Sequence, residues 1–353
     1  MAYPFSSDHE MIREVLSDFL QSWYENGKGP ERIYQSGKSF DENIWSRFAE
    51  DLGMAGVAIS EDFGGGGLDD LGRVVVMEEL GASLCAIPFL TTGGEVVDII
   101  SKIAKNQFKE EYLQKIAKGK IKGIFCPGHL SEEKKCINSA NADTADFILI
   151  SRLKNKIIEV VCLKVGTPGL EINSKKTIDP TRSFSDVDWS QVSDRDFLPI
   201  GTAEINFFTD IISQSQISLA AECVGGAQKC LDMTLEYTSQ RVQFGRPIAS
   251  FQAIKHRCAD MFILIETARS AVYAAAVATK DKKTESSLIA KAYATEAFFK
   301  VAGDAIQLHG GIGFTWEYPL HLFFKRSRAN RSMFGMPSED YKLLADNIFG
   351  DKP

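Results

Sequence analysis

The chain has 353 residues, 44% of them hydrophobic, and a formal net charge of −7 at pH 7. This length exceeds what one small hydrophobic core requires and suits two or three folded units. The negative charge and the lack of a basic tract exclude a dedicated nucleic-acid-binding protein.

The first twenty residues contain acidic side chains and no long apolar run. Signal peptides and transit peptides have a different composition. No stretch approaches the roughly 20 consecutive apolar residues of a membrane span. We therefore expect a cytosolic protein that has no membrane span.

Seven cysteines are scattered without C-x-x-C spacing. This predicts buried thiols rather than disulfides or a zinc site, and we expect no bound metal.

The first third of the sequence has helical periodicity. Residues 8–25 carry apolar side chains on one helix face, and the same spacing recurs in 40–52 and 90–120. Four glycines at 64–67 follow an acidic pair. A phosphate-binding loop would also need a G-K-[ST] sequence and a preceding long strand. Both are missing, so these glycines predict a turn.

The pattern changes after residue 122. Short runs of β-forming residues, separated by turn-forming residues, occupy 124–126, 147–150, 157–163 and 186–189. They predict a compact β domain between two helical regions.

The chain becomes helical again from residue 207. Apolar residues at three- and four-residue steps across 217–235 predict a long helix that ends near Arg241. Gly245 and Pro247 then break the periodicity. A second helix is expected after Ser250, which would cap its N-terminus, so the segment predicts a helix–turn–helix corner.

Basic side chains gather at this predicted corner, namely Arg241, Arg246, Lys255 and His256. Such a cluster is suited to binding an anionic group. A solvated basic corner without a ligand explains it equally well from these residues alone.

Residues 241–254, R-V-Q-F-G-R-P-I-A-S-F-Q-A-I, closely resemble the R-x-x-F-G-x-P-I-x-x-F-Q-A-I signature of the acyl-CoA dehydrogenase family. The resemblance implies an FAD site in which Arg241 contacts the pyrophosphate, Phe244 packs on the cofactor and Gln252 helps to hold the adenosine portion. A guanidinium suits this role because it stays charged and donates two parallel hydrogen bonds to phosphate oxygens.

A second segment, Q-L-H-G-G at 307–311, resembles a family motif that lies against the FAD of the neighbouring subunit. Gln307, Gly310 and Gly311 are therefore also expected to bind the cofactor, since glycine lets backbone donors approach phosphate closely. The two glycines also predict the end of a helix.

The resemblance implies an α+β, mainly α fold of three parts. An N-terminal helical domain (1–122) would precede a small middle β domain (123–205) and a C-terminal four-helix bundle that binds FAD (206–353). Segment 52–90 resembles the N-terminal domain. The middle region lacks the T-E-P-x-x-G-S-D and W-I-T-N-like segments with which the family contacts flavin and substrate.

Family members remove the α-proton of an acyl-CoA thioester with a glutamate while the β-hydride passes to the flavin. The two places where the family carries this glutamate hold Phe334 and Ser215 here, and neither side chain can remove a proton. Glu222 lies two helical turns beyond Ser215 on the same face and is the preferred substitute. Glu339 and Glu317 are weaker alternatives.

The resemblance implies a flavoprotein of lipid metabolism, namely an FAD-dependent acyl-CoA dehydrogenase. Bulky or branched acyl groups are among its expected substrates. Its expected partners are an electron-transfer flavoprotein or similar acceptor and further subunits in a dimer or tetramer. A short chain without the base also resembles a divergent bacterial branch in which two unlike subunits form one enzyme. The alternative is therefore an FAD-holding, non-catalytic subunit, and a remoter one is a helical scaffold without cofactor.

Overall fold

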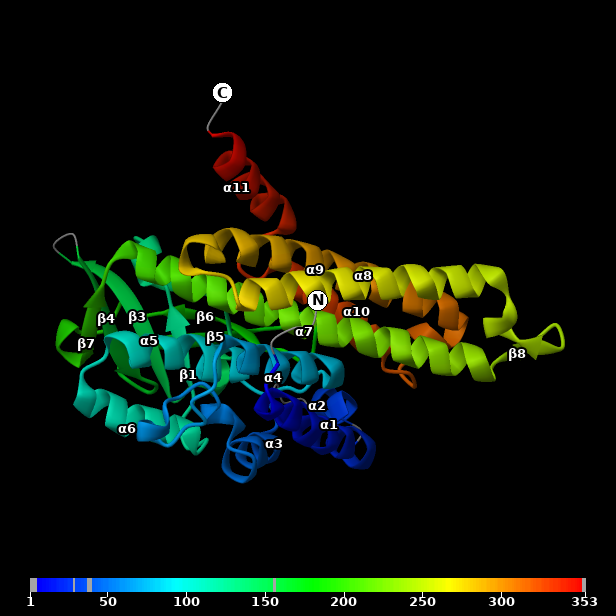
Figure 1. Cartoon of the computed structure of the whole chain (residues 1–353). Helices are drawn as coiled ribbons and strands as arrows, with labels where there is room; N and C mark the ends of the chain where they lie inside the picture. Colours follow the sequence, from blue (N-terminus) through cyan, green and yellow to red (C-terminus); the bar gives the residue numbers. More distant parts are fainter. Residues whose placement is uncertain (1–4, 28, 37–39, 155–156, 351–353) are drawn as a thin grey trace. The chain divides into compact units, whose positions relative to one another are not determined.

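The computed structural model describes residues 5–27, 29–36, 40–154 and 157–350 (Figure 1). The outer limits of the expected domains, residues 1 and 353, lie outside this part. The chain forms two compact units. The bundle unit comprises Met1–Arg32, Val74–Cys85 and Gln216–Pro353, and the sheet unit comprises Ile33–Arg73 and Ala86–Ser215.

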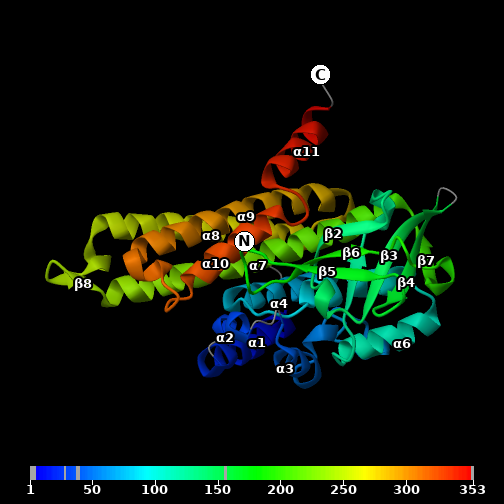
Figure 2. The same ribbon diagram turned by 180° about the vertical axis from the view of Figure 1, so that it is seen from behind.

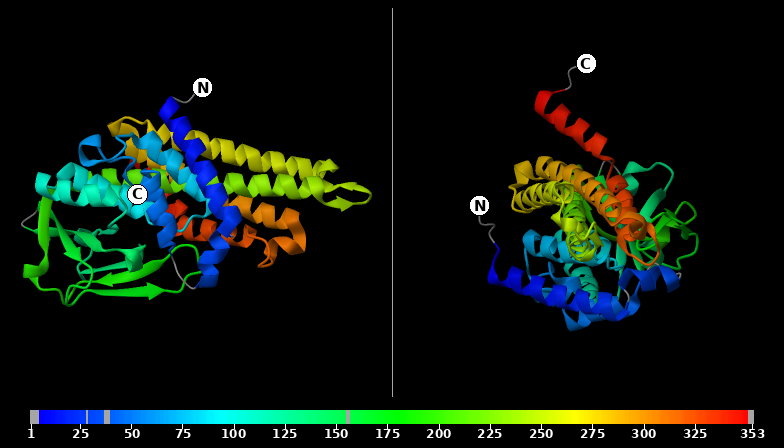
Figure 3. Two further views of the ribbon diagram at one scale, coloured as in Figure 1. Left: turned by 90° about the horizontal axis from the view of Figure 1, so that it is seen from below. Right: turned by 90° about the vertical axis from the view of Figure 1, so that its right-hand side faces the viewer.

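Long helices make up the bundle unit. In Figures 1 and 3, α7, α8, α9 and α10 run side by side, which agrees with the predicted four-helix bundle. The helices that lie wholly or partly in this unit are α1 (Ser7–Gly27), α2 (Gly29–Ser36), α4 (Asp70–Ser83), α7 (Ile205–Gln240), α8 (Gln252–Ala276), α9 (Lys280–His309), α10 (Leu320–Ser332) and α11 (Pro337–Phe349).

Two glycines allow α4 and α7 to cross at close range. A Cβ atom on Gly225 would lie 1.8 Å from the carbonyl oxygen of Glu78, and one on Gly81 would lie 2.1 Å from the carbonyl oxygen of Glu222. Any side chain would therefore force the two helices apart. The A-E-C-V-G-G sequence of α7 thus has a packing role.

The sheet unit contains two sheets and the helices α3 (Glu42–Ser46), α5 (Val97–Ile103) and α6 (Asn106–Ala117). One sheet has the order β1-β3-β4-β7, with β1 parallel to β3 and the other pairs antiparallel; the second has the antiparallel order β2-β6-β5 (Figure 2). The strands are β1 (Gly123–Cys126), β2 (Lys135–Ala140), β3 (Phe147–Lys154), β4 (Ile157–Lys164), β5 (Glu171–Lys175), β6 (Phe184–Asp188) and β7 (Leu198–Ala203).

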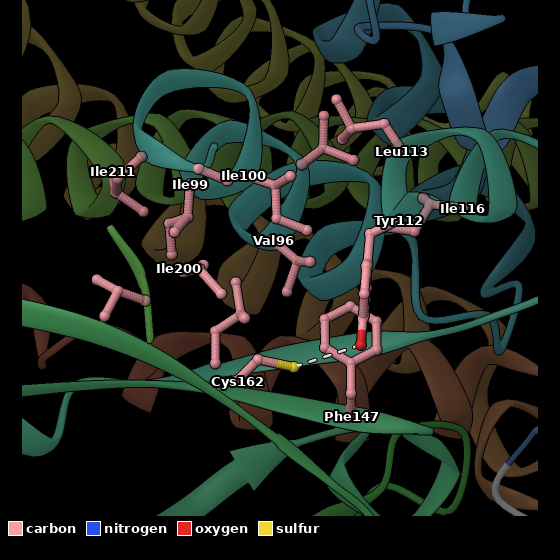
Figure 4. Close-up of a cluster of buried hydrophobic side chains, with 14 of the residues drawn as sticks. Val96, Ile99, Ile100, Tyr112, Leu113, Ile116, Phe147, Cys162, Ile200 and Ile211 are labelled. Atoms are coloured by element: carbon pink, nitrogen blue, oxygen red, sulfur yellow. Dashed lines mark hydrogen bonds between the residues drawn. The ribbon is translucent and has the colours of Figure 1, made fainter. Parts of the chain in front are cut away.

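Alternate residues of β3 enter two different cores, as the two-residue period of a strand requires. Phe147 and Leu149 pack against α5 and α6 in the cluster of Figure 4, while Ile148 and Ile150 face a cluster that includes residues of β6. Both faces of β3 are therefore covered. This explains why its sequence is a continuous apolar run rather than an alternating one.

The expected turn at residues 64–67 is present, and its backbone donors are already bonded. The N–H groups of Gly64, Gly65, Gly66 and Gly67 donate to carbonyl groups of residues 56–61. A Cβ atom on Gly65 would lie 2.2 Å from the carbonyl oxygen of Ile59. The glycines therefore let the chain pack against its own backbone, and their N–H groups are not available to a phosphate.

The predicted β runs correspond to β1, β3, β4 and β6, whereas β2, β5 and β7 were not predicted. Six cysteines are buried and Cys136 is partly exposed, all seven as free thiols. Among the described residues, no helix is long and apolar enough to cross a membrane, and no group of three His, Cys, Asp or Glu side chains could hold a metal ion.

Candidate active site

A β-hairpin, not the predicted helix–turn–helix corner, connects α7 to α8. Strand β8 (Val242–Gln243) pairs with β9 (Arg246–Pro247). The two residues between them, Phe244 and Gly245, have φ angles of 53° and 76°, the left-handed pair that defines a type I′ turn. Because Pro247 disfavours a helical conformation of the preceding residue, the chain turns back instead of continuing as a helix.

The predicted N-cap at Ser250 is wrong. Residues Ile248–Ser250 form a 3-10 turn, and α8 begins at Gln252 after an extended Phe251, without a side-chain cap. Gln252 is thus the exposed first residue of α8.

Phe244 is held in an unusual conformation at the tip of this hairpin. A left-handed backbone is costly for a bulky side chain, and the ring is 92% exposed with only an edge contact to Phe251. Strain combined with an uncovered aromatic ring suggests that the ring packs on a ligand or on another copy of the chain.

The base of the hairpin positions two arginines. The backbone of Arg241 accepts a hydrogen bond from Ile248 N–H at 2.8 Å and donates one to the carbonyl of Tyr237 at 2.9 Å. The Arg241 side chain is exposed. The guanidinium of Arg246 lies 4.2 Å from the ring centre of Phe251, so the two cations are presented on a rigid turn.

The second predicted cofactor segment lies at the same end of the bundle unit (Figure 2). Helix α9 ends at His309, whose ring stacks on Tyr237 with centroids 4.4 Å apart. Gly310 follows with φ 64°, and a Cβ atom on Gly310 or Gly311 would meet no atom within 4 Å. Their backbone is therefore open, and Gln307 is exposed beside it.

These residues fit a ligand that carries phosphate groups and a planar ring. The hairpin offers a guanidinium and an uncovered aromatic ring, and the end of α9 offers open glycine backbone. Backbone N–H groups and arginine are the usual protein ligands of phosphate. The structure thus brings Arg241, Phe244, Gln252, Gln307, Gly310 and Gly311 to one end of one unit.

Glu222 lies elsewhere in the bundle unit, in a buried polar cluster. Its Oε1 is 2.5 Å from Nη1 of Arg326, and its Oε2 is 3.4 Å from Nδ2 of Asn330. The adjacent cation stabilises the carboxylate, and both of its oxygens are engaged. A carboxylate held in this way is better suited to joining α7 and α10 than to accepting a proton from a substrate.

The weaker alternatives occupy exposed positions. Glu317 is exposed, and Glu339 caps α11 by accepting the N–H of Met336 at 2.7 Å. Neither has the water-excluded surroundings that raise the basicity of a carboxylate. Phe334, at the position of the family glutamate, has a left-handed backbone with φ 56°.

Sequence reasoning missed one unusual carboxyl group, that of Glu95. Burial raises its pKa to about 8, and the hydroxyl of Ser215 offsets this only in part. Glu95 follows two glycines inside the apolar stretch A-I-P-F-L-T-T-G-G-E-V-V-D-I-I. A single glutamate in such a stretch was the signal that could have identified it.

Comparison with known proteins agrees with this architecture. Residues 6–120 match the family model "Acyl-CoA dehydrogenase, N-terminal domain" and 205–340 match "Acyl-CoA dehydrogenase, C-terminal domain". The acyl-CoA dehydrogenase IpdE2 of Mycolicibacterium smegmatis is 31% identical over 347 residues, covering 98% of this chain and 100% of that protein.

Solved structures share the fold. Butyryl-CoA dehydrogenase from Megasphaera elsdenii superposes with a TM-score of 0.86 at 22% identity, over 99% of this chain and 100% of that one. A chain of the ChsE4–ChsE5 complex from Mycobacterium tuberculosis gives 0.86 at 21% identity, over 100% of both. The identity over nearly the full length of IpdE2 and the two matched domains show that the chain belongs to the acyl-CoA dehydrogenase family.

Proposed function

We propose that the chain is an FAD-dependent acyl-CoA dehydrogenase that introduces a double bond between Cα and Cβ of an acyl-CoA thioester. The family consists of flavoprotein oxidoreductases that act on acyl-CoA. The observation that carries the finer proposal is the shared end of the bundle unit, where the strained Phe244 and exposed Arg241 lie with the open backbone of Gly310 and Gly311.

Each of these residues has a proposed role toward the cofactor. Arg241 binds the pyrophosphate through charge-assisted hydrogen bonds, and Phe244 packs its uncovered ring on the cofactor. Gln252 and Gln307 hold the adenosine end, and Gly310 and Gly311 let backbone N–H groups approach phosphate. When bound, FAD supplies the acceptor for the β-hydride.

Assembly of several subunits is part of the proposal. Large apolar side chains are exposed near the cofactor end and on α11. The beginning of α11 is held to α9 by the buried Lys291–Asp340 ion pair, while its C-terminal end projects outward in Figures 1 and 3. The exposed apolar side chains include Phe244, Phe314, Trp316, Leu343, Ile348 and Phe349. Apolar surface of this extent favours a dimer or tetramer. Two copies that pair through this shared end would bring the hairpin of one subunit to the 307–311 segment of its neighbour, so that both subunits bind the same FAD.

The alternative remains an FAD-holding subunit whose unlike partner supplies the base. The surroundings of Glu222 favour it over Glu222 acting as the base in a chain that works alone. A related fold in a complex of two different proteins, ChsE4 and ChsE5, also supports it. Four points stay predictions. They are the bulky or branched acyl group, the electron-transfer flavoprotein or similar acceptor, the cytosolic location, and the domain limits 1–122, 123–205 and 206–353.

The test is to purify the chain with added FAD and to follow flavin absorbance during titration with straight-chain, branched and sterol-derived acyl-CoAs. Bound flavin that is bleached by one of these thioesters supports the proposed dehydrogenation. Bound flavin that none of them bleaches favours the non-catalytic subunit. A chain that stays colourless with excess FAD would overturn both.

A further inference from the structure

His309, the last residue of α9, lies between the two segments that we assign to FAD. In the chain it immediately precedes Gly310 and Gly311. Its ring stacks on that of Tyr237 near the end of α7, with the centroids 4.4 Å apart and the planes inclined by 20°. All of these residues belong to the bundle unit. One ring therefore connects the end of α7 to the open backbone that follows α9.

Three further polar contacts hold the His309 ring. Nδ1 lies 2.8 Å from the carbonyl oxygen of Ala305 and donates its hydrogen to it, because a carbonyl oxygen can only accept. Nε2 lies 3.3 Å from the hydroxyl oxygen of Tyr318. The carbonyl of Met233, one turn before Tyr237 on α7, also forms a hydrogen bond with the ring. The ring is thus fixed by α7, by α9 and by the segment that precedes α10.

The His309 side chain is not suited to binding the cofactor itself. Only 3% of the residue is exposed, so a ligand does not reach the ring. Burial lowers the pKa of His309, and the carbonyl groups of Ala305 and Met233 offset this only in part. The ring is therefore neutral at neutral pH and offers no charge to a phosphate group. Any effect of His309 on FAD has to act through its neighbours.

The glycine turn after α9 packs on His309. The helix ends at Gly310, which has φ 64°, and residues Gly310–Phe314 then form a 3-10 turn. A Cβ atom on Gly313 would lie 2.9 Å from the Cβ atom of His309, so the turn folds back onto this residue without space for a side chain. The position of His309 therefore determines where the open backbone of Gly310 and Gly311 lies.

Tyr237 extends the same constraint to the hairpin. Its carbonyl oxygen accepts the N–H of Arg241 at 2.9 Å, and the carbonyl oxygen of Arg241 accepts the N–H of Ile248 at 2.8 Å. These two hydrogen bonds join the last turn of α7 to the base of the hairpin. A displacement of Tyr237 would therefore also displace Arg241, the residue that we assign to the pyrophosphate.

We propose that His309 is a positioning residue for FAD, a role that rests on the proposed function. Its ring, held between Tyr237 and Tyr318, sets the hairpin and the glycine turn at a fixed distance from each other. Where two copies share FAD, the hairpin and the glycine turn of one subunit face two different FAD molecules. The contact between His309 and Tyr237 then fixes the spacing of these two cofactor sites.

Titration of the FAD-free full chain with FAD, followed by flavin fluorescence well below the unfolding temperature, tests this role. His309→Leu and Tyr237→Leu each remove the stacked pair and should each raise the Kd about 10-fold. The double variant should raise the Kd by less than the product of the two single effects, because both substitutions remove the same contact. Tyr237→Phe keeps the ring and should retain most of the affinity.

Tyr273→Leu is the matched control for a loss of stability alone. Tyr273 is a buried aromatic residue of the same unit, and it lies 21 positions after Gln252, the first residue of α8. At the rise of an α-helix this is about 30 Å from the hairpin end of α8. The variant should lower the melting temperature and leave the Kd for FAD unchanged.

A purely structural role of His309 would give a different result. His309→Leu would then lower the melting temperature, as Tyr273→Leu does, without a change in the Kd, and this would overturn the proposal. Independent effects of His309→Leu and Tyr237→Leu would also contradict it. Tyr237 is only half-buried, so its variants decide the question if His309→Leu does not fold. Wild type that binds no FAD would instead overturn the proposed function.

Discussion

Glu222 and Arg326 form an ion pair inside the bundle unit, with Oε1 of the glutamate 2.5 Å from Nη1 of the arginine and side-chain exposures of 3% and 2%. The pair joins α7 to α10. Removing one member of such a buried pair leaves the other charged and without its counterion, which costs about 3–5 kcal/mol.

Glu222→Gln should therefore lower the free energy of unfolding by about 3–5 kcal/mol, because Arg326 loses its countercharge. Urea denaturation of the FAD-loaded chain measures this. Glu111→Gln, which breaks an exposed ion pair with Lys115 on α6, is the control and should change stability by less than about 1 kcal/mol. Unchanged stability together with loss of flavin bleaching by acyl-CoA would instead support Glu222 as the base.

Arg241→Ala should weaken FAD binding. The variant loses a charge-assisted contact of about 1.5–3 kcal/mol, which corresponds to a roughly 10- to 150-fold higher Kd. Flavin fluorescence titration of the FAD-free protein measures the Kd. Arg195→Ala removes a similarly exposed arginine in the sheet unit and should leave the Kd unchanged; equal losses in both variants would speak against a specific contact.

Phe244→Asn distinguishes the effect of Phe244 on the stability of the hairpin from its effect on FAD binding. Asn-Gly is the preferred sequence of a type I′ turn, so the variant should fold at least as stably as wild type, with a gain of up to about 1 kcal/mol from relieved strain. Its FAD affinity should nevertheless fall, since the ring is lost. Thermal unfolding without FAD and a flavin titration give the two quantities. A less stable variant with normal FAD affinity would show that Phe244 stabilises the fold and does not contact FAD.

The long helices and main strands could be predicted because each depends on a local period. The end of α7 was predicted within one residue. Strands β1, β3 and β4 coincide with apolar runs, and β6 overlaps the alternating run at 186–189. By contrast, β5 has the polar sequence E-I-N-S-K and is largely exposed. It is a strand because it pairs with β6, and that partner is not visible in a local pattern.

The candidate site was predictable only where one segment carries a motif. The hairpin and the end of α9 are two such segments. The type I′ turn of the hairpin was nevertheless not predicted, because a phenylalanine such as Phe244 rarely adopts a left-handed backbone. Contacts between distant parts of the chain could not be predicted. Glu95 and Ser215, for example, interact in the structure but are 120 positions apart in sequence. Likewise, nothing in the sequence near Glu222 indicates that Arg326 neutralises it.

Assembly should be linked to the cofactor. If FAD lies between the hairpin of one subunit and the 307–311 segment of another, FAD-loaded protein should sediment as a dimer or larger, and Arg241→Ala should shift the distribution toward monomer at low concentration. Analytical ultracentrifugation with absorbance detection of flavin measures both. A flavin-loaded monomer would contradict a shared site.

The stability of wild type relative to Glu95→Gln should depend on pH in a defined direction. Below about pH 4.3 the carboxyl group is protonated in the folded and the unfolded chain, so its stabilising contribution is fully present. Between that pH and about 8 the unfolded chain ionises while burial keeps the folded carboxyl protonated, the pKa of Glu95 being raised to about 8. Unfolding then releases a proton, and wild type loses about 1.4 kcal/mol per pH unit through this group.

Glu95→Gln lacks this titration, whereas Cys136 and Asp98, which act on Glu95, and Arg73, which pairs with Asp98, are the same in both proteins. The difference in unfolding free energy, variant minus wild type, should therefore rise from pH 5 to pH 8 and level off above it. Urea denaturation at half-unit pH steps measures the difference, and the remaining titrations cancel in the subtraction. Parallel pH profiles would mean that the folded carboxyl group of Glu95 ionises like an ordinary glutamate and that burial does not raise its pKa.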